Sequence, residues 1–505
     1  MPKYLLAHDL GTSGNKATLY TTDGELVASR TYPYDTKYFN ANWAEQNPND
    51  WWKAVCISTG QLIQGIDTRQ IACVSFSAQM MGCLCVDRQG RPLRNSIIYS
   101  DQRAQKETDK ILQHIDAMDF YKIVGHRASP SYSLEKLMWV KNNEPDVYKN
   151  TYKMLNAKDY IAFKLTGRMV TDYTDASGTN AFDLNTYRWS EKIVDIAGID
   201  GDKLPEARES TFVVGEVTKE AAEETGLREG TPVVIGAGDG MCASVGAGCT
   251  RPGIAYNYVG SSSWIGITTE KPVYDVKMRT MTWAHAVPGY VNPIGTMQTA
   301  GTSYSWLKNE ICRIETKEAL EKGVSPYEII NDEIEKSPPG ARGILFLPYL
   351  LGERTPHWNP NARGAFIGIT VGHKREDLLR AVMEGVTYNL NTILNIFKNY
   401  VPIDSMIVIG GGAKGRIWRQ MMADIYGVRI LKPNYLEEAT SMGAAVIGGI
   451  GVGEFKDFDA INKFIKIESE HNPDPSKREI YDKTYQVFLH SYDALTGIYE
   501  ELARL

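Results

Sequence analysis

Two acidic residues of this chain stand where a carboxylate could act on a bound substrate, and the first is Asp9. It ends an apolar, strand-like run and precedes the turn Gly11-Thr12-Ser13-Gly14, which is followed by Lys16. Backbone amides in such a turn can form an anion-binding concavity, and the two hydroxyls and the lysine add donors for phosphate oxygens. The carboxylate suits Mg²⁺, held directly or through water. An ordinary glycine hairpin has the same composition, and the segment has neither Walker A nor G-x-G-x-x-G spacing.

The second acidic residue is Asp239, which stands between Gly238 and Gly240 directly after the apolar run Val233-Val234-Ile235. A general base that takes a proton from a hydroxyl needs this kind of rigid and reachable placement. Aspartate also caps helices well, so a helix N-cap is the alternative, and capping and catalysis do not exclude each other. We predict that Asp239 is the catalytic base.

Two further glycine-rich loops could contact a nucleotide. The loop Gly260-Ser261-Ser262-Ser263 lies between two strand-like runs and supplies a second set of donors for the β and γ phosphates. The loop Gly410-Gly411-Gly412-Ala413 precedes a helix and would let the backbone approach a flat ligand, such as adenine and its ribose. Plain packing of a helix on a sheet is the alternative for this last loop.

A possible set of contacts to hydroxyl groups follows a predicted strand at Tyr99-Ser100-Asp101-Gln102-Arg103. Asp101 offers an acceptor and Arg103 a forked donor two residues later, so the pair could hold several hydroxyls of a small polar ligand. A surface ion pair is the alternative interpretation.

The elements that must position these residues occur in the same order twice. A strand, a turn of glycine and hydroxyl residues, and a second strand are predicted at residues 4–20 and again at residues 254–269. A strand also leads through a glycine loop into a helix at Asp239 and again at Arg416. We infer a duplicated α/β unit with a boundary near Arg251-Pro252-Gly253. The prediction is two domains, residues 1–250 and 251–505, because single cores rarely grow beyond ~300 residues.

Helix ends are readable at three places from their cap residues. Asn47 precedes Pro48, a helix from Ser133 must end before Pro145, and Asn156 is followed three residues later by Asp159. The run from Ala439 to Gly453 is free of charge but shorter than the roughly 20 residues that span a bilayer, so it predicts a buried helix.

Composition excludes several classes of protein. The 505 residues are 43% hydrophobic and 23% charged with a net charge of −6, and no run of Lys and Arg could follow a nucleic-acid backbone. The chain enters a strand pattern at once, which leaves no room for a signal peptide. Its seven cysteines are scattered without a C-x-x-C pair, which is typical of reduced thiols. We expect a cytoplasmic protein with no nucleic-acid or membrane partner.

These residues belong to an ordered set of motifs that resembles the FGGY family of carbohydrate kinases, and within it most closely the xylulokinases. The resemblance runs nearly from end to end and is very specific. Its motifs are Asp9 to Gly14, Trp43-Ala44-Glu45-Gln46-Asn47-Pro48, Ser77-Ala78-Gln79-Met80, Asp101 with Arg103, Thr171 to Gly178, Gly238-Asp239-Gly240, Phe346 to Leu350 with Gly352 to Pro356, and Gly410 to Ala413 with Trp418-Arg419-Gln420-Met421.

What the resemblance implies is an α/β fold similar to actin, hexokinase and the Hsp70 ATPase, with two duplicated ribonuclease H-like domains around a cleft. The sugar would lie mainly on residues 1–250 and ATP mainly on residues 251–505. The family's catalytic base matches Asp239, and Asp9 matches the carboxylate that organises Mg²⁺. ATP contacts are expected at Gly11, Thr12, Ser13, Lys16, Gly260, Ser261, Gly301, Gly411, Gly412, Ala413 and Arg416. Sugar contacts are expected at Gln79, Met80, Met81, Asp101, Arg103 and Asp239.

Two departures from the xylulokinase pattern fall on the sugar side. Met81 stands where these enzymes usually have His after the Gln-Met pair, and Tyr99 stands where a Trp is expected. Phosphorylation of D-xylulose to D-xylulose 5-phosphate is the first expectation, with another ketose, a polyol or autoinducer-2 as alternatives. A rival of another class is an actin-like or chaperone-like nucleotide switch without sugar turnover. A homodimer is the candidate assembly.

Overall fold

The structure is a computed structural model that describes residues 3–505. Contacts divide the chain into two compact units, each assembled from separate segments. Unit 1 holds the residues up to Pro252 together with Thr268–Pro293 and Glu438–Lys466. Unit 2 holds Gly253–Ile267, Ile294–Glu437 and Ile467–Leu505. The predicted division of the chain after residue 250 stays a prediction. It treats each domain as one continuous stretch, whereas two segments beyond residue 252 belong to unit 1.

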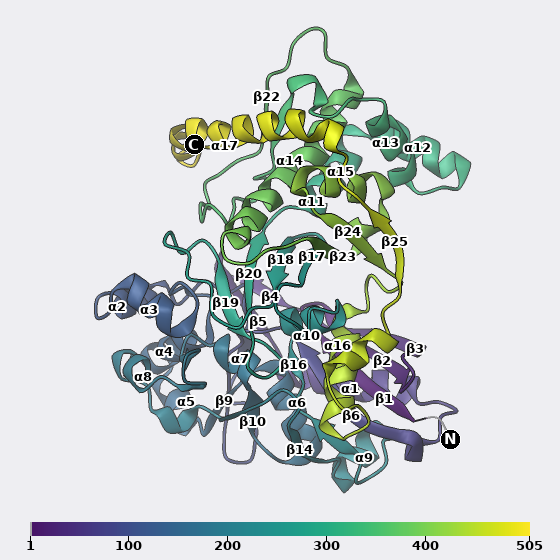
Figure 1. Ribbon diagram of the computed structural model, residues 1–505. Helices are drawn as coiled ribbons and strands as arrows, with labels where there is room; N and C mark the ends of the chain where they lie inside the picture. The colour runs from purple at the N-terminus through teal and green to yellow at the C-terminus, as the bar shows by residue number, and fades with distance from the viewer. Residues whose placement is uncertain (1–2) are drawn as a thin grey trace. The chain divides into compact units, whose positions relative to one another are not determined.

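Unit 1 is built on a mixed sheet with the strand order β14-β15-β6-β1-β2-β3, and β16 also pairs with β6 (Figure 1). The strand β1 pairs antiparallel with β2 and parallel with β6, while β15 and β16 also run parallel to β6. The carboxyl ends of β1, β6 and β16 therefore lie at one edge of the sheet. The bounds are β1 (Tyr4–Leu10), β2 (Gly14–Thr21), β3 (Leu26–Pro33), β6 (Ile71–Ala78), β14 (Val213–Glu216), β15 (Pro232–Val234) and β16 (Ala237–Gly238).

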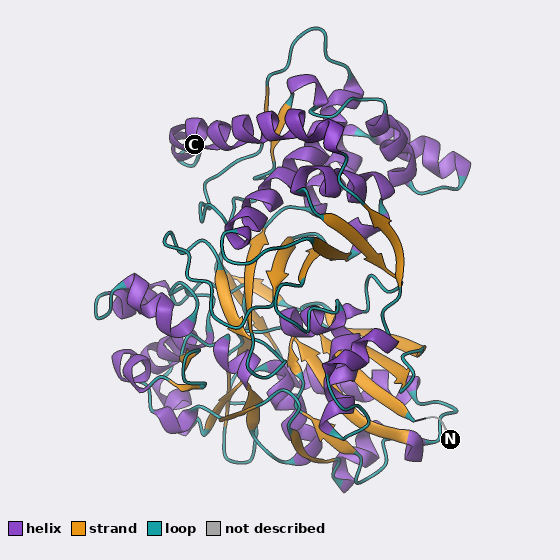
Figure 2. Ribbon diagram, in the orientation of Figure 1, coloured by secondary structure: helices purple, strands orange, loops and turns teal. Residues whose placement is uncertain are grey.

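Helices pack on both faces of this sheet, which Figure 2 shows as helices (purple) beside strands (orange). Neighbouring side chains of a strand point to opposite faces. Leu6 therefore joins the apolar core that contains Trp51 of α1 (Pro48–Leu62). Its neighbour Leu5 lies close to Gly449 of α16 (Ala439–Gly451) on the other face. The strands that carry the predicted site are thus buried on both sides, which holds their ends rigidly.

The predicted helix starts of unit 1 are confirmed. The Asn47 side chain caps α1 by accepting a hydrogen bond from the Asn49 amide at 3.1 Å. Asn156 and Asp159 form a capping box at the start of α6 (Ala157–Thr166). The helix α4 (Ser133–Asn143) ends before Pro145, and the apolar run after Glu438 is the buried helix α16.

Unit 2 is built on a second mixed sheet that contains β20-β18-β17-β23-β24-β25 in that order. The bounds are β17 (Ala255–Val259), β18 (Ser263–Ile267), β20 (Val291–Met297), β23 (Ser405–Ile409), β24 (Arg429–Pro433) and β25 (Ile467–His471). The unit boundary falls within β20, whose residues from Ile294 onward pair with β18. The helices of this unit are α11 (Gly301–Trp306), α12 (Arg313–Lys322), α13 (Pro326–Glu335), α14 (Arg375–Lys398), α15 (Arg416–Tyr426) and α17 (Arg478–Leu502).

The two sheets have the same topology, as the inferred duplication requires. Read from one end, β3-β2-β1-β6-β15-β14 and β20-β18-β17-β23-β24-β25 both pair antiparallel, antiparallel, parallel, parallel and antiparallel. Each sheet therefore has a hairpin between its second and third strands in this order. These hairpins, β1-β2 and β17-β18, contain the two predicted phosphate loops.

Most of the remaining elements, though not β19 (Met281–Ala284), lie outside the two main sheets. Short sheets join β4 (Lys37–Phe39), β5 (Trp43–Gln46) and β8 (Ser96–Ile97); β7 (Leu84–Val86) and β9 (Lys153–Leu155); β10 (Val170–Asp172) and β13 (Glu206–Arg208); β11 (Phe182–Asp183) and β12 (Arg188–Trp189); and β21 (Leu345–Leu347) and β22 (Ala365–Ile367). The strand β19 (Met281–Ala284) belongs to unit 1. The other helices of unit 1 are α2 (Gln105–Leu112), α3 (Ala117–Val124), α5 (Pro145–Asn150), α7 (Tyr173–Ser177), α8 (Glu191–Ala197), α9 (Lys219–Thr225) and α10 (Asp239–Gly246). In residues 3–505, no helix has both the length and the apolar composition to cross a bilayer.

Glycines allow the helices α10 and α16 to touch through their backbones. A Cβ atom on Gly443 of α16 would collide with the carbonyl of Cys242, and one on Gly246 of α10 would collide with the carbonyl of Ala439. Both collisions involve backbone atoms, which cannot move aside as a flexible side chain can. This close contact fixes α10, whose first residue is Asp239, against the sheet of unit 1.

We predict that Gly443→Ala destabilises unit 1 by about 1–3 kcal/mol because the added methyl group forces the two helices apart. Thermal unfolding followed by circular dichroism measures the effect. Gly60→Ala in α1 is the matched control, since a Cβ there would be 4.0 Å from its nearest neighbour. That control should be neutral or should gain up to about 1 kcal/mol. Equal unfolding temperatures for Gly443→Ala and the wild type would contradict this account of the helix contact.

Candidate active site

Asp9 lies near the end of β1 and is held by hydroxyl groups from two other elements of unit 1. The Ser77 hydroxyl on β6 donates to Asp9 Oδ1 at 2.8 Å, and the Thr440 hydroxyl on α16 donates to Oδ2 at 2.6 Å. The carboxylate is half-buried. Each carboxylate oxygen has a second lone pair, so Asp9 can still accept hydrogen bonds from the water shell of a Mg²⁺ ion.

The turn after Asp9 has its carbonyl groups held by neighbouring residues. The carbonyl of Gly11 accepts from the Tyr34 hydroxyl at 2.5 Å, and that of Thr12 accepts from Gln46 Nε2 at 2.7 Å. In the described part of the chain, the amides of Thr12 and Ser13 have no hydrogen-bond acceptor. The turn is therefore rigid and has donors available for an anion, as the sequence predicts for a phosphate loop.

Lys16 contacts an acidic residue. Its Nζ lies 3.1 Å from Glu438 Oε1, just before α16, and about a quarter of each side chain is exposed. A phosphate at this turn would have to compete with Glu438 for the ammonium group. The predicted contact between Lys16 and ATP stays a prediction.

Asp239 is the first residue of α10, directly after the short strand β16. Its Oδ1 accepts a hydrogen bond from the Gly240 amide at 2.7 Å, and the residue is half-buried. Burial, and next the negative charge of Asp9, raise the pKa of Asp239 from 3.8 to about 7. A carboxylate with a pKa near neutrality is suited to accept a proton from a hydroxyl group under physiological conditions.

Among the residues predicted to contact a sugar, Gln79 and Met80 are buried. Gln79 Nε2 donates to Gln46 Oε1 at 2.6 Å, and Gln46 in turn donates to the Thr12 carbonyl, so the two motifs are connected. Met80 packs so closely on Gly238 that a Cβ atom there would collide with its sulfur. Met80 thus supports the backbone next to Asp239.

Met81 adopts an unusual backbone conformation. Its φ is +63°, in the left-handed region, and its carbonyl accepts a hydrogen bond from Lys136 Nζ at 2.8 Å. The same ammonium group donates to the Ser131 carbonyl at 2.5 Å. Burial lowers the pKa of Lys136 from 10.5 to about 7, against the opposing effect of the Asp101 charge. Sequence analysis missed Lys136, because nothing in its local pattern distinguishes it from a surface lysine.

Asp101 and Arg103 form a buried pair, so the alternative of a surface ion pair is wrong. Asp101 accepts hydrogen bonds from the Ala44 amide at 2.5 Å and from Arg103 Nη2 at 2.7 Å, and its side chain is fully buried. Arg103 also pairs with Glu45 at 2.8 Å and lies over the ring of Trp43 at 3.9 Å. These contacts use most of the polar groups of the pair, and their direct contact with a sugar stays a prediction.

In unit 2 the structure brings three predicted nucleotide residues together. The Gly301 amide at the start of α11 donates to the Gly260 carbonyl at 2.9 Å. The amides of Ala300 and Thr302 both donate to the Ser261 carbonyl at 3.0 Å. A Cβ atom on Gly301 would collide with the Gly260 carbonyl, which explains the glycine.

The second glycine loop of unit 2 packs on the end of β17. A Cβ atom on Gly412 would collide with Val259, whereas Gly411 has open space around it. Arg419 Nη1 anchors the loop by donating to the carbonyls of Ala413 at 2.5 Å and Lys414 at 3.0 Å. The predicted Arg416 pairs with Glu335 of α13. From the sequence, Arg419 is recognised only as part of a family motif, and no role is predicted for it.

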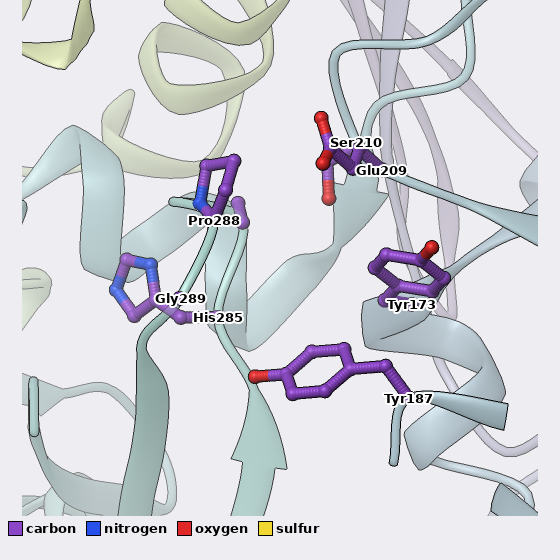
Figure 3. A pocket seen from close by; sticks show the side chains of 8 residues that line it. Tyr173, Tyr187, Glu209, Ser210, His285, Pro288 and Gly289 are labelled. Carbon is purple, nitrogen blue, oxygen red and sulfur yellow. The ribbon is translucent and has the colours of Figure 1, made fainter. Parts of the chain in front are cut away.

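Each unit also has a cavity of its own. In unit 2 a cavity of about 450 Å³ includes Arg416 and Glu335 in its lining, and it contains none of the other predicted nucleotide residues. In unit 1 a cavity of about 200 Å³ is lined by Tyr173, Tyr187, Ser210 and His285 among others (Figure 3). None of the predicted sugar contacts lines this second cavity. Neither cavity holds three or more His, Cys, Asp or Glu residues placed to bind a metal, and no such group occurs in residues 3–505.

The two sheets have the same topology, and each has a glycine-containing hairpin in its centre. Together with Asp239, a carboxylate whose pKa lies near neutrality, they define a phosphotransferase with the actin-like ATPase fold. The N-terminal domain of the FGGY family of carbohydrate kinases matches residues 4–246, and the family's C-terminal domain matches residues 255–452. The chain belongs to this family and is a carbohydrate kinase. The rival prediction of a nucleotide switch without sugar turnover is thereby set aside.

Named relatives of similar length include kinases for two different substrates. The chain is 32% identical to a gluconokinase of Bacillus licheniformis, over 100% of this chain and 98% of the relative. It is also 32% identical to a xylulose kinase of Bacillus subtilis, over 98% and 99% of the two chains. The ligand-bound xylulose kinase and the gluconate kinase of Lactobacillus acidophilus have TM-scores of 0.91 and 0.92, at 28% and 27% identity. Each of these two similarities covers 99% of this chain and 100% of the solved chain.

The raised pKa of Asp239 predicts a pH-dependent effect of Asp239→Asn on stability. The folded chain binds one more proton than the unfolded chain between about pH 4 and pH 7, so the contribution of this group to stability falls as pH rises through that window. The Asn side chain does not titrate, so the variant does not lose stability as pH rises through this window. It should unfold like the wild type near pH 4 and be more stable by up to about 4 kcal/mol at pH 8. Calorimetry across this range measures the difference, and a gain independent of pH would refute the assignment.

Proposed function

We propose that this carbohydrate kinase transfers the γ-phosphoryl group of ATP to the primary hydroxyl of D-xylulose and forms D-xylulose 5-phosphate. The observation that carries the proposal is Asp239, a half-buried carboxylate at the start of α10 whose pKa is raised to about 7 beside Asp9. This placement supports a general base for an alcohol. The names of several relatives support the ketose.

In the proposed reaction Asp239 accepts the proton of the sugar hydroxyl while the hydroxyl oxygen forms a bond to the γ phosphorus. The bond between that phosphorus and the β,γ-bridging oxygen breaks, and ADP leaves with the electron pair. In this reaction the Thr12 and Ser13 amides would donate hydrogen bonds to phosphate oxygens. When bound, Mg²⁺ would neutralise charge on the phosphates, and Asp9 is the residue that would hold its water shell. The two hydroxyl groups on Asp9 keep that carboxylate oriented.

The surroundings of Met81 support a neutral sugar over an aldonate such as gluconate. A carboxylate substrate needs a cation or several donors, because a buried charge without a partner is costly. The two cations at this place are buried: Arg103, itself a predicted sugar contact, pairs with Asp101 and Glu45, and Lys136 donates to two backbone carbonyls. Unit 1 thus offers no ready counter-ion at this place among its described residues. Other ketoses, polyols and autoinducer-2 carry no carboxylate and remain the alternative substrates.

The role of Asp239 is tested by Asp239→Asn in an assay that measures ADP release. We expect kcat to fall by about 10²–10⁴-fold, the usual contribution of a general base, with KM for ATP within about threefold of the wild type. Asp116→Asn is the matched control, because Asp116 also stands at a helix start in unit 1 but caps α3. Its kcat should stay within about twofold of the wild type, since Asn caps helices as well as Asp. Near-normal turnover by Asp239→Asn would discard the proposal.

The substrate is tested with a panel of D-xylulose, D-ribulose, L-fuculose, xylitol, autoinducer-2 and D-gluconate, each with ATP and Mg²⁺. We expect the highest kcat/KM for D-xylulose, and a value for gluconate lower by on the order of 100-fold because its carboxylate lacks a partner. The same panel with Asp239→Asn corrects for ATP hydrolysis without transfer. A preference for gluconate would overturn the argument from Arg103 and Lys136.

A further inference from the structure

A cluster of one lysine and three aspartates lies buried in unit 1, and none of the four is among the predicted site residues. Lys158 Nζ is 2.8 Å from Asp159, 2.8 Å from Asp172 and 2.9 Å from Asp175, and all four side chains have no exposed surface. Burial, together with the other two carboxylates, raises the pKa of Asp175 well above its ordinary value. Buried ionic groups are weak evidence for stability, so the cluster calls for another explanation.

Asp172 receives the largest number of contacts within this cluster. One oxygen, Oδ1, accepts from Lys158, and the other, Oδ2, accepts from the Thr174 hydroxyl at 2.7 Å and from the Ser210 hydroxyl at 2.6 Å. Ser210 also lines the cavity shown in Figure 3. Asp172 is therefore fixed in position and polarises the Thr174 hydroxyl.

The Thr174 hydroxyl connects this cluster to the backbone next to Asp239. It accepts a hydrogen bond from the Gly238 amide at 2.8 Å while it donates to Asp172. Gly238 belongs to β16, a strand of two residues that pairs only with β6. A strand of two residues makes few backbone hydrogen bonds. The Thr174 hydroxyl, which accepts from the side of the strand that faces away from β6, therefore contributes a large share of its restraint.

Packing restrains the same peptide from two other directions. Met80 lies against Gly238, and it also approaches Gly178, the residue after α7, where a Cβ atom would be 3.1 Å from its methyl group. Gly236 has a φ of +71°, and a Cβ there would collide with the Phe76 carbonyl. The backbone ahead of Asp239 is thus held by pairing with β6, by packing of Met80 and by Thr174, whose hydroxyl is the side-chain acceptor of the Gly238 amide.

We propose that Thr174 is a positioning residue for phosphoryl transfer. Its hydroxyl joins the buried carboxylate of Asp172 to the Gly238 amide and fixes the peptide that aims the Asp239 carboxylate, while Lys158 anchors Asp172. The inference rests on the proposed role of Asp239 as the base. Because a displacement of about 1 Å can cost on the order of 100-fold in rate, a single bridging hydroxyl is enough to affect catalysis.

The first test compares Thr174→Val, which removes the hydroxyl at constant shape, with Thr174→Ser, which keeps it. We expect Thr174→Val to lower kcat per folded enzyme by on the order of 10-fold, with KM for ATP and sugar within about twofold, and Thr174→Ser to restore most of the rate. Thr179→Val is the matched control. Thr179 is equally buried, and its hydroxyl donates to the Ala176 carbonyl and accepts from the Ala181 amide. The control should lose stability but keep its kcat.

A purely structural role for Thr174 predicts a different result. Thr174→Val would then unfold at a lower temperature, as we expect for Thr179→Val, but its folded fraction would have wild-type kcat, and this outcome overturns the proposal. If Thr174→Val fails to fold, Thr174→Cys is compared with Thr174→Ser, because a thiol is the weaker donor and acceptor. The proposal expects a lower kcat for the cysteine variant, and equal values would refute it.

The double variant Thr174→Val/Asp239→Asn separates this inference from the proposed function. If Thr174 acts through Asp239, the double variant should have the kcat of Asp239→Asn alone, within about twofold. A further loss equal to that of Thr174→Val in the wild type would show that Thr174 acts elsewhere. High activity of Asp239→Asn would refute the proposed base itself, whereas a slow Asp239→Asn with a normal Thr174→Val would refute only the positioning role.

Discussion

The site of unit 1 depends on placing two carboxylates at the same edge of one sheet. Asp9 lies near the carboxyl end of β1 and Asp239 directly follows β16, and both strands run parallel to β6, so the topology leaves the two acids as neighbours. Like charges in a half-buried place repel each other, and the protein distinguishes the two acids by their hydrogen-bond partners. Asp9 accepts from two hydroxyl groups on separate elements, whereas Asp239 accepts from the amide of the next residue. The charge of Asp9 then helps to raise the pKa of Asp239. Pairs of acids separated in this way can take different roles in one reaction.

The duplicated topology explains how one architecture provides two different kinds of surface. In both units the central hairpin lies next to a parallel strand, which is β6 in unit 1 and β23 in unit 2. Unit 1 has acids at this edge, and unit 2 has glycines that allow backbone segments to touch, as Gly301 does with Gly260. The same strand order therefore places two carboxylates at the edge of one sheet and closely packed glycine backbone at the edge of the other. The difference lies in the residues that follow the strands, not in the strands themselves.

Features that depend on neighbours in the chain could be predicted from the sequence. The hairpin at Gly11 to Gly14, the cap at Asn47 and the capping box at Asn156 are set by local turn and cap chemistry, and so is the position of Asp239 after a strand. Contacts between distant segments could not be predicted. Thr440 reaches Asp9 across 431 residues, and Glu438 reaches Lys16 across 422. Local sequence also cannot tell whether a charged residue is exposed. For Arg103 the structure adds what the local sequence cannot show, namely that Glu45 pairs with the guanidinium group and the ring of Trp43 lies against it.

The loop at Met81, where we predict sugar contacts, combines backbone strain with a buried cation, and the two are connected. A methionine with a φ of +63° costs on the order of 1 kcal/mol, and such a conformation persists only where the surroundings enforce it. Lys136 provides that restraint, since its ammonium group holds the carbonyl of Met81 together with that of Ser131. Donors used in this way cannot also bind a substrate. The arrangement uses a charged residue to shape the loop and leaves Met81, an apolar side chain, as the half-exposed residue of the segment. A surface of this kind selects a ligand by shape more than by charge.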